Sequence, residues 1–142
     1  MNKYTKRLIS EWNQHGKIVI AVDFDSTIYP WHTIDNTSDR DRTIDLLKKA
    51  HYTGAYIVVN TCSNQDRYKE IEDYCKDKGL KIDGINVNPV ELPYGKTGKI
   101  YANIYLDDRA GLNESLNILE EAMYKRRSEI EREDSIFYDD VA

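Results

Sequence analysis

The sequence has little that would direct the chain to a membrane or to an oxidising compartment. No apolar run approaches the roughly 20 residues that a membrane-spanning helix requires. The N-terminal segment also lacks the long apolar stretch and small-residue cleavage site of a secretory signal. Two cysteines, Cys62 and Cys75, are too few for a disulfide framework and suit a reducing environment. We therefore expect a cytoplasmic protein without a membrane span.

An excess of positive charge is absent as well. The chain has 20 lysines and arginines against 25 aspartates and glutamates, which gives a formal net charge of −5. A broad, sequence-independent grip on nucleic acid depends on clustered basic residues, so this balance argues against it. It still allows one phosphate group to be bound in a local pocket.

The 142 residues suffice for one domain with a sizeable core, and their apolar patterning predicts alternating helices and strands. Helices are predicted over 3–15, from 37 or 38, over 63–79 and along 112–123; strands are predicted over 18–22, 56–60, 82–87 and 102–106. This alternation predicts an α/β fold, a doubly wound, Rossmann-like and mostly parallel sheet with helices on both faces. The single domain spans 1–142, with a core over about 17–125 and a frayed, mobile tail over about 127–142.

Three of the predicted strands end in side chains suited to ligand binding. Asp23 and Asp25 follow the first strand, Thr61 follows the second, and the pair Asp107-Asp108 follows the last. In open α/β sheets, ligands gather beyond the carboxyl ends of the strands. Because Asp25 is two residues from Asp23, strand alternation would direct both side chains into one crevice. The alternative for Asp-x-Asp alone is an Asx-type turn that closes the strand.

The surrounding residue types point to a magnesium ion and a phosphate. Carboxylates suit Mg²⁺, which prefers few protein ligands together with water and phosphate oxygens. Lys96 and Lys99 lie just upstream of the last strand, close enough in sequence to reach the same edge. Ser63, with Asp66 three residues later, predicts a capped helix N-terminus, and such a terminus favours anions.

These segments, in this order, resemble the motifs of the haloacid dehalogenase (HAD) superfamily of aspartate-dependent phosphohydrolases. Residues 22–27 match the first motif, a strand followed by Asp-x-Asp-x-Thr. Residues 57–61 match the second, a strand ending in Thr or Ser, and residues 104–108 match the fourth, a strand ending in an acidic pair. The third motif is a lysine ahead of the fourth. Lys99 has the spacing of small family members, and Lys96 is the alternative.

The resemblance implies a role for each residue in a phosphatase reaction. Asp23 would attack phosphorus and form an aspartyl-phosphate, while Asp25 would protonate the leaving oxygen and then activate the hydrolytic water. Mg²⁺ would be bound by the Asp23 carboxylate, the Asp25 backbone carbonyl and Asp107. Thr61 and the lysine, Lys99, would hold the phosphoryl oxygens. Candidates for substrate contact or for support of these groups are Thr27, Ser63, Lys96, Asp108 and Arg109.

The resemblance covers residues 17 to about 123 and implies a protein without a cap domain. Residues 28–36 leave room only for a flap, and residues 88–98 only for a loop. Capless family members act on large substrates that close the site themselves, or assemble so that a neighbouring subunit supplies the lid. The expected substrate is a phosphorylated small molecule or nucleotide, with a phosphorylated nucleic-acid end as a further option. Asp-Asp-Arg at 107–109 also resembles the deoxyribonucleotidase branch, but three residues are too few to assign it.

Two other functions compete with a phosphatase. One is a catalytically silent protein that keeps this fold as a binding or structural part of a larger assembly. The other is a P-loop nucleotide kinase, because Gly95-Lys96-Thr97 and the apolar run into Asp107-Asp108 resemble Walker elements. A phosphate loop would need glycine where Val90 stands, and a kinase leaves Asp23 and Asp25 unexplained.

Overall fold

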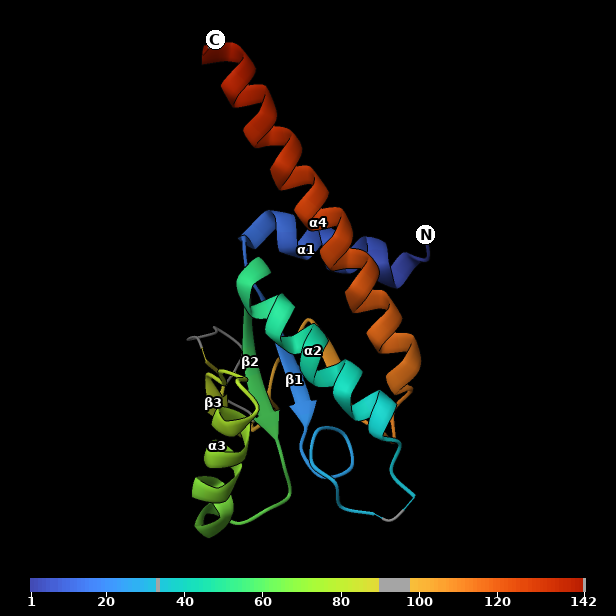
Figure 1. Ribbon diagram of the computed structural model, residues 1–142, viewed down its shortest axis with the longest axis vertical. Helices are drawn as coiled ribbons and strands as arrows, with labels where there is room; N and C mark the ends of the chain where they lie inside the picture. Colours follow the sequence, from blue (N-terminus) through green and yellow to red (C-terminus); the bar gives the residue numbers. More distant parts are fainter. Residues whose placement is uncertain (33, 90–97, 142) are drawn as a thin grey trace.

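A computed structural model describes residues 1–32, 34–89 and 98–141 of the chain, with 133–141 described by their backbone alone. Helices and strands alternate along it from the first helix to the third strand (Figure 1). The elements are α1 (Lys3–His15), β1 (Ile18–Asp23), α2 (Thr37–Gly54), β2 (Ala55–Asn60), the 3₁₀ turn η1 (Gln65–Arg67), α3 (Tyr68–Asp77), β3 (Gly84–Ile85), β4 (Ile104–Leu106) and α4 (Leu112–Val141). Val90 and Gly95-Lys96-Thr97, on which the kinase alternative depends, lie outside the described residues.

The strands form one parallel sheet in the order β3-β2-β1-β4. β1 pairs with β2 on one side and β4 on the other, with Ile20 opposite both Ile57 and Ile104. A strand covered on both faces needs apolar side chains on both, which explains the continuous apolar run of β1. The predicted α/β fold with a Rossmann-like parallel sheet is confirmed. Only residues 24–36 separate β1 from α2, so no large cap is inserted there.

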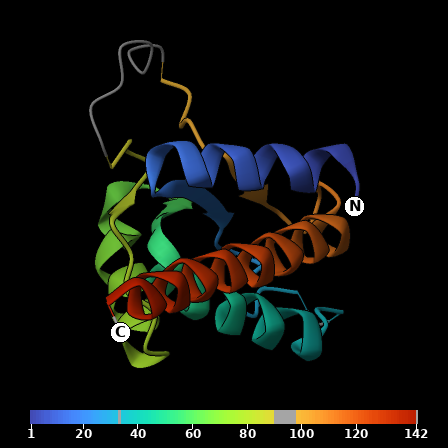
Figure 2. The same ribbon diagram turned by 90° about the horizontal axis from the view of Figure 1, so that it is seen from above.

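The two faces of the sheet are covered differently. The face that carries Ile20 packs against buried side chains from all four helices; α2 crosses in front of β1 and β2 in Figure 1, and α4 runs between α1 and α2 in Figure 2. On the second face, Val19 and Val58 pack with Ala102. Right-handed crossovers place α2 and α3 on one face, because β1, β2 and β3 follow each other in one direction. Ile100 and Ala102, which precede β4, also pack on the second face and belong to no helix, although helices were expected on both faces.

β3 and β4 are shorter than predicted because side chains replace part of the backbone ladder beside them. Asp83 accepts the Ile57 N–H through its carboxylate at 2.8 Å, while its own N–H donates to the Ile57 carbonyl at 2.7 Å. Asn103 bonds Val19 in the same two ways, at 2.7 and 2.8 Å. The sheet is therefore held together beyond the formal ends of its two short strands.

α4 is longer than predicted. It runs as one helix from Leu112 to Val141, where a frayed end was expected from about 127. No glycine or proline follows Gly111, so no residue type there interrupts the helix. Leu116 and Leu119 are buried, as predicted, and the C-terminal part of α4 extends past α1, away from the sheet (Figure 1). Within the described ranges, no helix is both long and apolar enough to cross a membrane.

Candidate active site at the carboxyl edge of the sheet

The chain turns sharply where β1 ends at Asp23. Three successive N–H groups, those of residues 27–29, donate to the Phe24 carbonyl at 3.3, 3.1 and 3.0 Å. Ser26 has a φ of +68°, the left-handed conformation that reverses a chain within a few residues. This reversal follows both acids in the chain. The strand period predicted one shared crevice for both carboxylates, but in the structure each carboxylate has its own partners.

Asp23 joins two acids that follow β4, and we call these three residues the acidic cluster. One carboxylate oxygen from each of Asp23, Asp107 and Asp108 lies within 4.8 Å of the other two. The Thr27 hydroxyl, which is fully buried, lies 3.1 Å from Asp23 Oδ2 and 3.2 Å from Asp108 Oδ1. It also accepts the Asp108 N–H at 3.0 Å. A hydroxyl has one proton to donate, so the two carboxylates share a single donor.

The electrostatics of the acidic cluster favour a bound proton or cation. Burial, followed by the charge of Asp107, raises the pKa of Asp23 from its ordinary value of 3.8 to about 7. Among the described residues, no basic side chain forms an ion pair with any member of the cluster. Carboxylate oxygens with uncompensated charge are the ligands that Mg²⁺ prefers. The cluster therefore fits a divalent cation.

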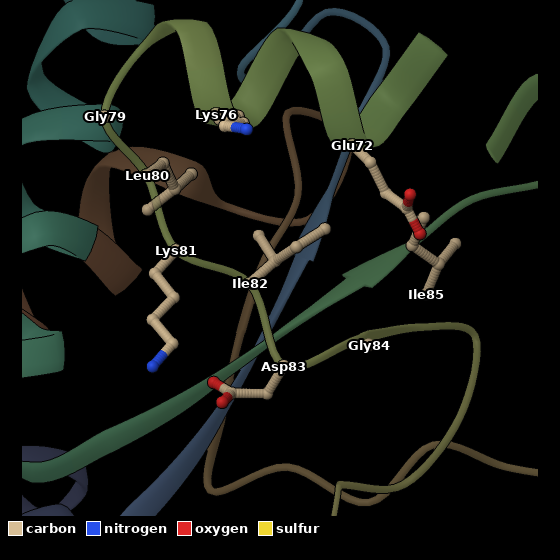
Figure 3. A pocket seen from close by; sticks show the side chains of 9 residues that line it. All are labelled: Glu72, Lys76, Gly79, Leu80, Lys81, Ile82, Asp83, Gly84 and Ile85. Atoms are coloured by element: carbon tan, nitrogen blue, oxygen red, sulfur yellow. The ribbon is translucent and has the colours of Figure 1, made fainter. Parts of the chain in front are cut away.

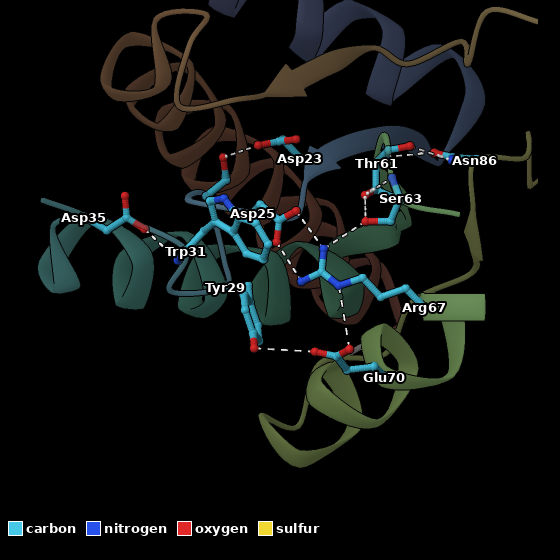
Figure 4. A network of polar contacts seen from close by, with 11 residues as sticks. Asp23, Asp25, Tyr29, Trp31, Asp35, Thr61, Ser63, Arg67, Glu70 and Asn86 are labelled. Carbon is cyan, nitrogen blue, oxygen red and sulfur yellow. Dashed lines mark hydrogen bonds and ion pairs between the residues drawn. The ribbon is translucent and has the colours of Figure 1, made fainter. Parts of the chain in front are cut away.

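The Asp25 carboxylate is bound by an arginine that the sequence prediction missed. Arg67 donates from Nη1 to Oδ2 at 2.7 Å and from Nη2 to Oδ1 at 2.8 Å (Figure 4). This bidentate bond is the main reason that the pKa of Arg67 is raised above its ordinary value. The two residues are 42 positions apart. The available signal was a cation in the first helical turn after Thr61, which alone does not identify its partner.

Thr61 and Ser63 lie beside this ion pair. Ser63 Oγ accepts from Arg67 Nη1 at 2.8 Å and from Thr61 Oγ1 at 3.0 Å. The Asn86 side chain binds both the N–H and the carbonyl of Thr61, at 2.8 and 2.7 Å. The capping-box prediction for Ser63 is wrong: the helical turns begin at Gln65, without a side-chain cap bond. Its hydroxyl instead lies between Thr61 and Arg67.

Lys99, the predicted third-motif lysine, forms no ion pair with Asp23 in the described structure. Its Nζ lies 5.8 Å from the centre of the Tyr105 ring, whose face attracts an ammonium group. Lys96 lies outside the described residues. Arg109 contributes its backbone N–H, which donates to Asp107 Oδ1 at 2.9 Å, and it is exposed. In the described structure Lys99 therefore lacks the contact with Asp23 that would identify it as the lysine of the third motif, and its role in holding phosphoryl oxygens stays a prediction.

Of the hollows in the described part of the chain, one lies at the β3 edge of the sheet and another borders the acidic cluster. The hollow of about 540 Å³ lies between α3 and the edge strand β3 and has the apolar side chains of Leu80 and Ile82 in its wall (Figure 3). Neither Asp25 nor any member of the acidic cluster lines it. The second, of about 320 Å³, opens beside the cluster. Its lining includes the acids Asp35, Asp39, Asp108 and Glu114. The negative charge on this side of the site disfavours anions, whereas Arg67 provides a positive group on the other side.

No protein-family model and no curated protein matches the chain. One solved structure is similar: that of a conserved protein from Bacteroides thetaiotaomicron, with 24% identity and a TM-score of 0.54. The similarity covers 66% of this chain and 77% of the other. At this identity the likeness shows the fold alone.

Proposed function

We propose that the chain is a Mg²⁺-dependent phosphatase of the HAD type, which hydrolyses a phosphate monoester through an aspartyl-phosphate on Asp23. The observation that carries this proposal is the acidic cluster, in which Asp23 meets the two acids after β4 within 4.8 Å. The Asp25 carboxylate and the Thr61 hydroxyl lie at the same edge, at the ends of β1 and β2. The motif order of the sequence and the fold of the neighbour from Bacteroides thetaiotaomicron are compatible with it.

The donor set suits magnesium. The ion would be held by the Asp23 carboxylate, the Asp25 backbone carbonyl and Asp107, with Asp108 beside them. Mg²⁺ bound there neutralises charge on the phosphoryl oxygens and keeps Asp23 ionised at neutral pH. The raised pKa of Asp23 supports this assignment, because burial and then the charge of Asp107 both disfavour its ionised form, which a bound cation would stabilise.

Asp23 and Asp25 would divide the chemistry. An Asp23 carboxylate oxygen attacks phosphorus, and the bond between phosphorus and the ester oxygen breaks as Asp25 donates a proton to that oxygen. Water then attacks the aspartyl-phosphate while Asp25 takes its proton. The acyl phosphate bond breaks at phosphorus, which releases inorganic phosphate and restores the Asp23 carboxylate. Thr61 would position the phosphoryl oxygens, so the protein acts mainly through placement and charge.

The expected substrates are phosphorylated small molecules, nucleotides or phosphorylated nucleic-acid ends, in the cytoplasm. With residues 24–36 as the only insertion between β1 and α2, the substrate or a neighbouring subunit would close the site. A screen of these phosphate monoesters with Mg²⁺ identifies the class.

The defining experiment is hydrolysis of an aryl phosphate with Mg²⁺ by the wild-type chain and by Asp23→Asn. The variant removes the nucleophile, so we expect its rate to fall by more than about 10³-fold. Asp45→Asn is the matched control, because Asp45 is an exposed residue of α2 that pairs with Lys49 at 3.0 Å. Equal activity in Asp23→Asn and the wild type would exclude the mechanism.

One observation favours a second candidate, a binding protein of this fold without turnover. The Asp25 carboxylate, which should exchange protons with the substrate, is engaged at both oxygens by Arg67. If this pair never opens, the site binds phosphate and Mg²⁺ but does not hydrolyse esters. Phosphate binding combined with no hydrolysis across the substrate screen would support this candidate.

A further inference from the structure

Arg67 is held at the edge of the sheet on three sides. Its guanidinium makes the bidentate bond to Asp25 and a third bond, at 2.8 Å, to Ser63 Oγ. Its Nε also lies 3.7 Å from the Glu70 carboxylate. The side chain is only 18% exposed, so these contacts fix it in one place. Figure 4 shows the guanidinium pointing at Asp25 from the side opposite Asp35.

Aromatic rings surround the same guanidinium. Its central carbon lies 5.3 Å from the ring centres of Phe24 and Tyr29 and 5.1 Å from that of Trp31. Such rings attract the flat face of a guanidinium and leave its N–H edge free to bind. The cation can therefore stay on the rings while its edge exchanges one anionic partner for another.

The arginine also connects the two strand ends that the proposed reaction uses. A continuous chain of hydrogen bonds runs from Asp25 through Arg67 and Ser63 to Thr61, and we call these four residues the arginine network. A phosphoryl group positioned by the Thr61 hydroxyl would thus lie next to Arg67 Nη1. The charge distribution also favours a phosphoryl group beside Arg67, because the other side of the site is the acidic hollow beside Asp108.

We propose that Arg67 is a substrate-binding residue that exchanges the Asp25 carboxylate for the phosphate group of the substrate. Carboxylate and phosphate both present two oxygens to the same guanidinium fork, so the two anions compete for one set of donors. When phosphate takes the fork, the Asp25 carboxylate is released toward the leaving oxygen. The catalytic consequence rests on the proposed phosphatase function, whereas the exchange itself is a binding event that needs no turnover.

A double-mutant cycle tests the exchange, with inorganic phosphate as the probe in Mg²⁺ and calorimetry as the readout. Arg67→Ala should weaken phosphate binding by about tenfold or more, since it removes a charged bidentate donor. Asp25→Asn should strengthen binding, because it removes the competitor for the fork. In the Arg67→Ala background, Asp25→Asn should increase the affinity for phosphate much less than it does in the wild type. Arg67→Lys should recover only part of the affinity, because an ammonium group lacks the fork.

Three results would overturn the exchange. The first is a wild-type protein that does not bind phosphate. The second is Arg67→Ala binding phosphate as the wild type does. The third is an equal gain from Asp25→Asn in both backgrounds, which would mean that only the overall charge matters.

Two controls keep these results interpretable. Thermal unfolding shows whether each variant is folded, and Arg67→Gln replaces Arg67→Ala if the smaller side chain prevents folding. Lys69→Ala is the matched loss of a cation on α3, where Lys69 pairs with Asp73 at 2.8 Å, and it should bind phosphate normally. Arg67-dependent phosphate binding without hydrolysis would exclude the phosphatase and keep the exchange. Hydrolysis that depends on Asp23, together with phosphate binding that does not depend on Arg67, would exclude the exchange and keep the phosphatase.

Discussion

Asp23 and Asp25 are two residues apart, yet they lie in opposite electrostatic settings. Asp23 belongs to the acidic cluster, whose charge no described basic residue neutralises, and its pKa is raised to about 7. Asp25 belongs to the arginine network, where a bidentate bond to Arg67 compensates its charge. Partners from other segments make this difference: Asp107 and Asp108 for Asp23, and Arg67 for Asp25. They give the site an anionic half suited to a metal and a neutralised half suited to a phosphate.

This difference assigns separate requirements to the two halves. The acidic cluster lacks a positive charge, so a metal ion completes it, and its properties should depend on metal and pH. The arginine network already has its positive charge, so an anion can enter only by replacing one that is present. Variants of the acidic cluster should accordingly change metal binding, and variants of the arginine network should change phosphate binding.

Among the effects on the binding and stability of the acidic cluster, the largest is expected on metal affinity. Asp107→Asn removes one carboxylate ligand and should weaken Mg²⁺ binding by about 100-fold or more, as measured by calorimetry in the absence of phosphate. Asp45→Asn, on the exposed face of α2, should leave the affinity unchanged. Unchanged Mg²⁺ binding in Asp107→Asn would mean that the acidic cluster is not the metal site.

A smaller effect is expected from the buried hydroxyl that joins two members of the acidic cluster. Thr27→Val keeps the shape of the side chain but leaves the Asp108 N–H and the Asp23 carboxylate without their partner. The free energy of unfolding, measured with denaturant in EDTA, should fall by about 1–3 kcal/mol.

Thr43→Val is the matched control for this substitution. Thr43 is also fully buried, but its hydroxyl donates only to the Asp39 carbonyl, at 2.7 Å within α2. Its loss should cost about 1 kcal/mol or less. Equal losses in the two variants would show that Thr27 has no special role between the acids.

The smallest expected effect is a dependence of stability on pH in the metal-free protein. The pKa of Asp23 is raised in the folded state, so between its ordinary value of 3.8 and about 7 the folded chain binds a proton that the unfolded chain does not. This contribution is fully present below the ordinary value and is lost as the pH rises through about 7. From pH 5 to pH 8, the unfolding free energy should fall by about 1 kcal/mol, after allowance for solvent screening of a half-exposed group.

Comparison with Asp23→Asn isolates this contribution, because asparagine does not titrate. Denaturant unfolding of both proteins in EDTA should show the fall in the wild type and a flatter profile in the variant. Mg²⁺ affinity of the wild type should change in the opposite direction and rise with pH, since the ion competes with the proton. Parallel stability profiles would contradict the raised pKa.

Much of the fold could be predicted from sequence because the relevant patterns are local. The continuous apolar run of β1 identified the central strand, and Gly16, at φ +75°, ends α1 as a left-handed cap should. The predictions were less accurate where long-range bonds decide the structure. Asn103, for example, provides part of the ladder beside Val19 from 84 positions away, so β4 is shorter than its apolar pattern indicated.

The candidate site divides in the same way. The sequence placed acids at the ends of β1 and β4, and strand order brings these ends together, so the acidic cluster follows from local pattern and topology. The arginine network does not, because Arg67 was one cation among many. Lys99 shows the converse: its spacing matched a motif, but in the described structure its ammonium group lies against Tyr105.

By itself the sequence determined a parallel α/β sheet with acids at one edge, because the alternation of apolar and polar residues specifies strands, helices and their buried sides. Only the tertiary structure decided which charged side chains lie next to one another. Crossover packing brings Arg67 to Asp25 across 42 positions, whereas Asp23 meets two further acids. The physical reason is that burial patterns are encoded residue by residue, whereas charge pairing depends on the positions of side chains from segments that meet only after folding.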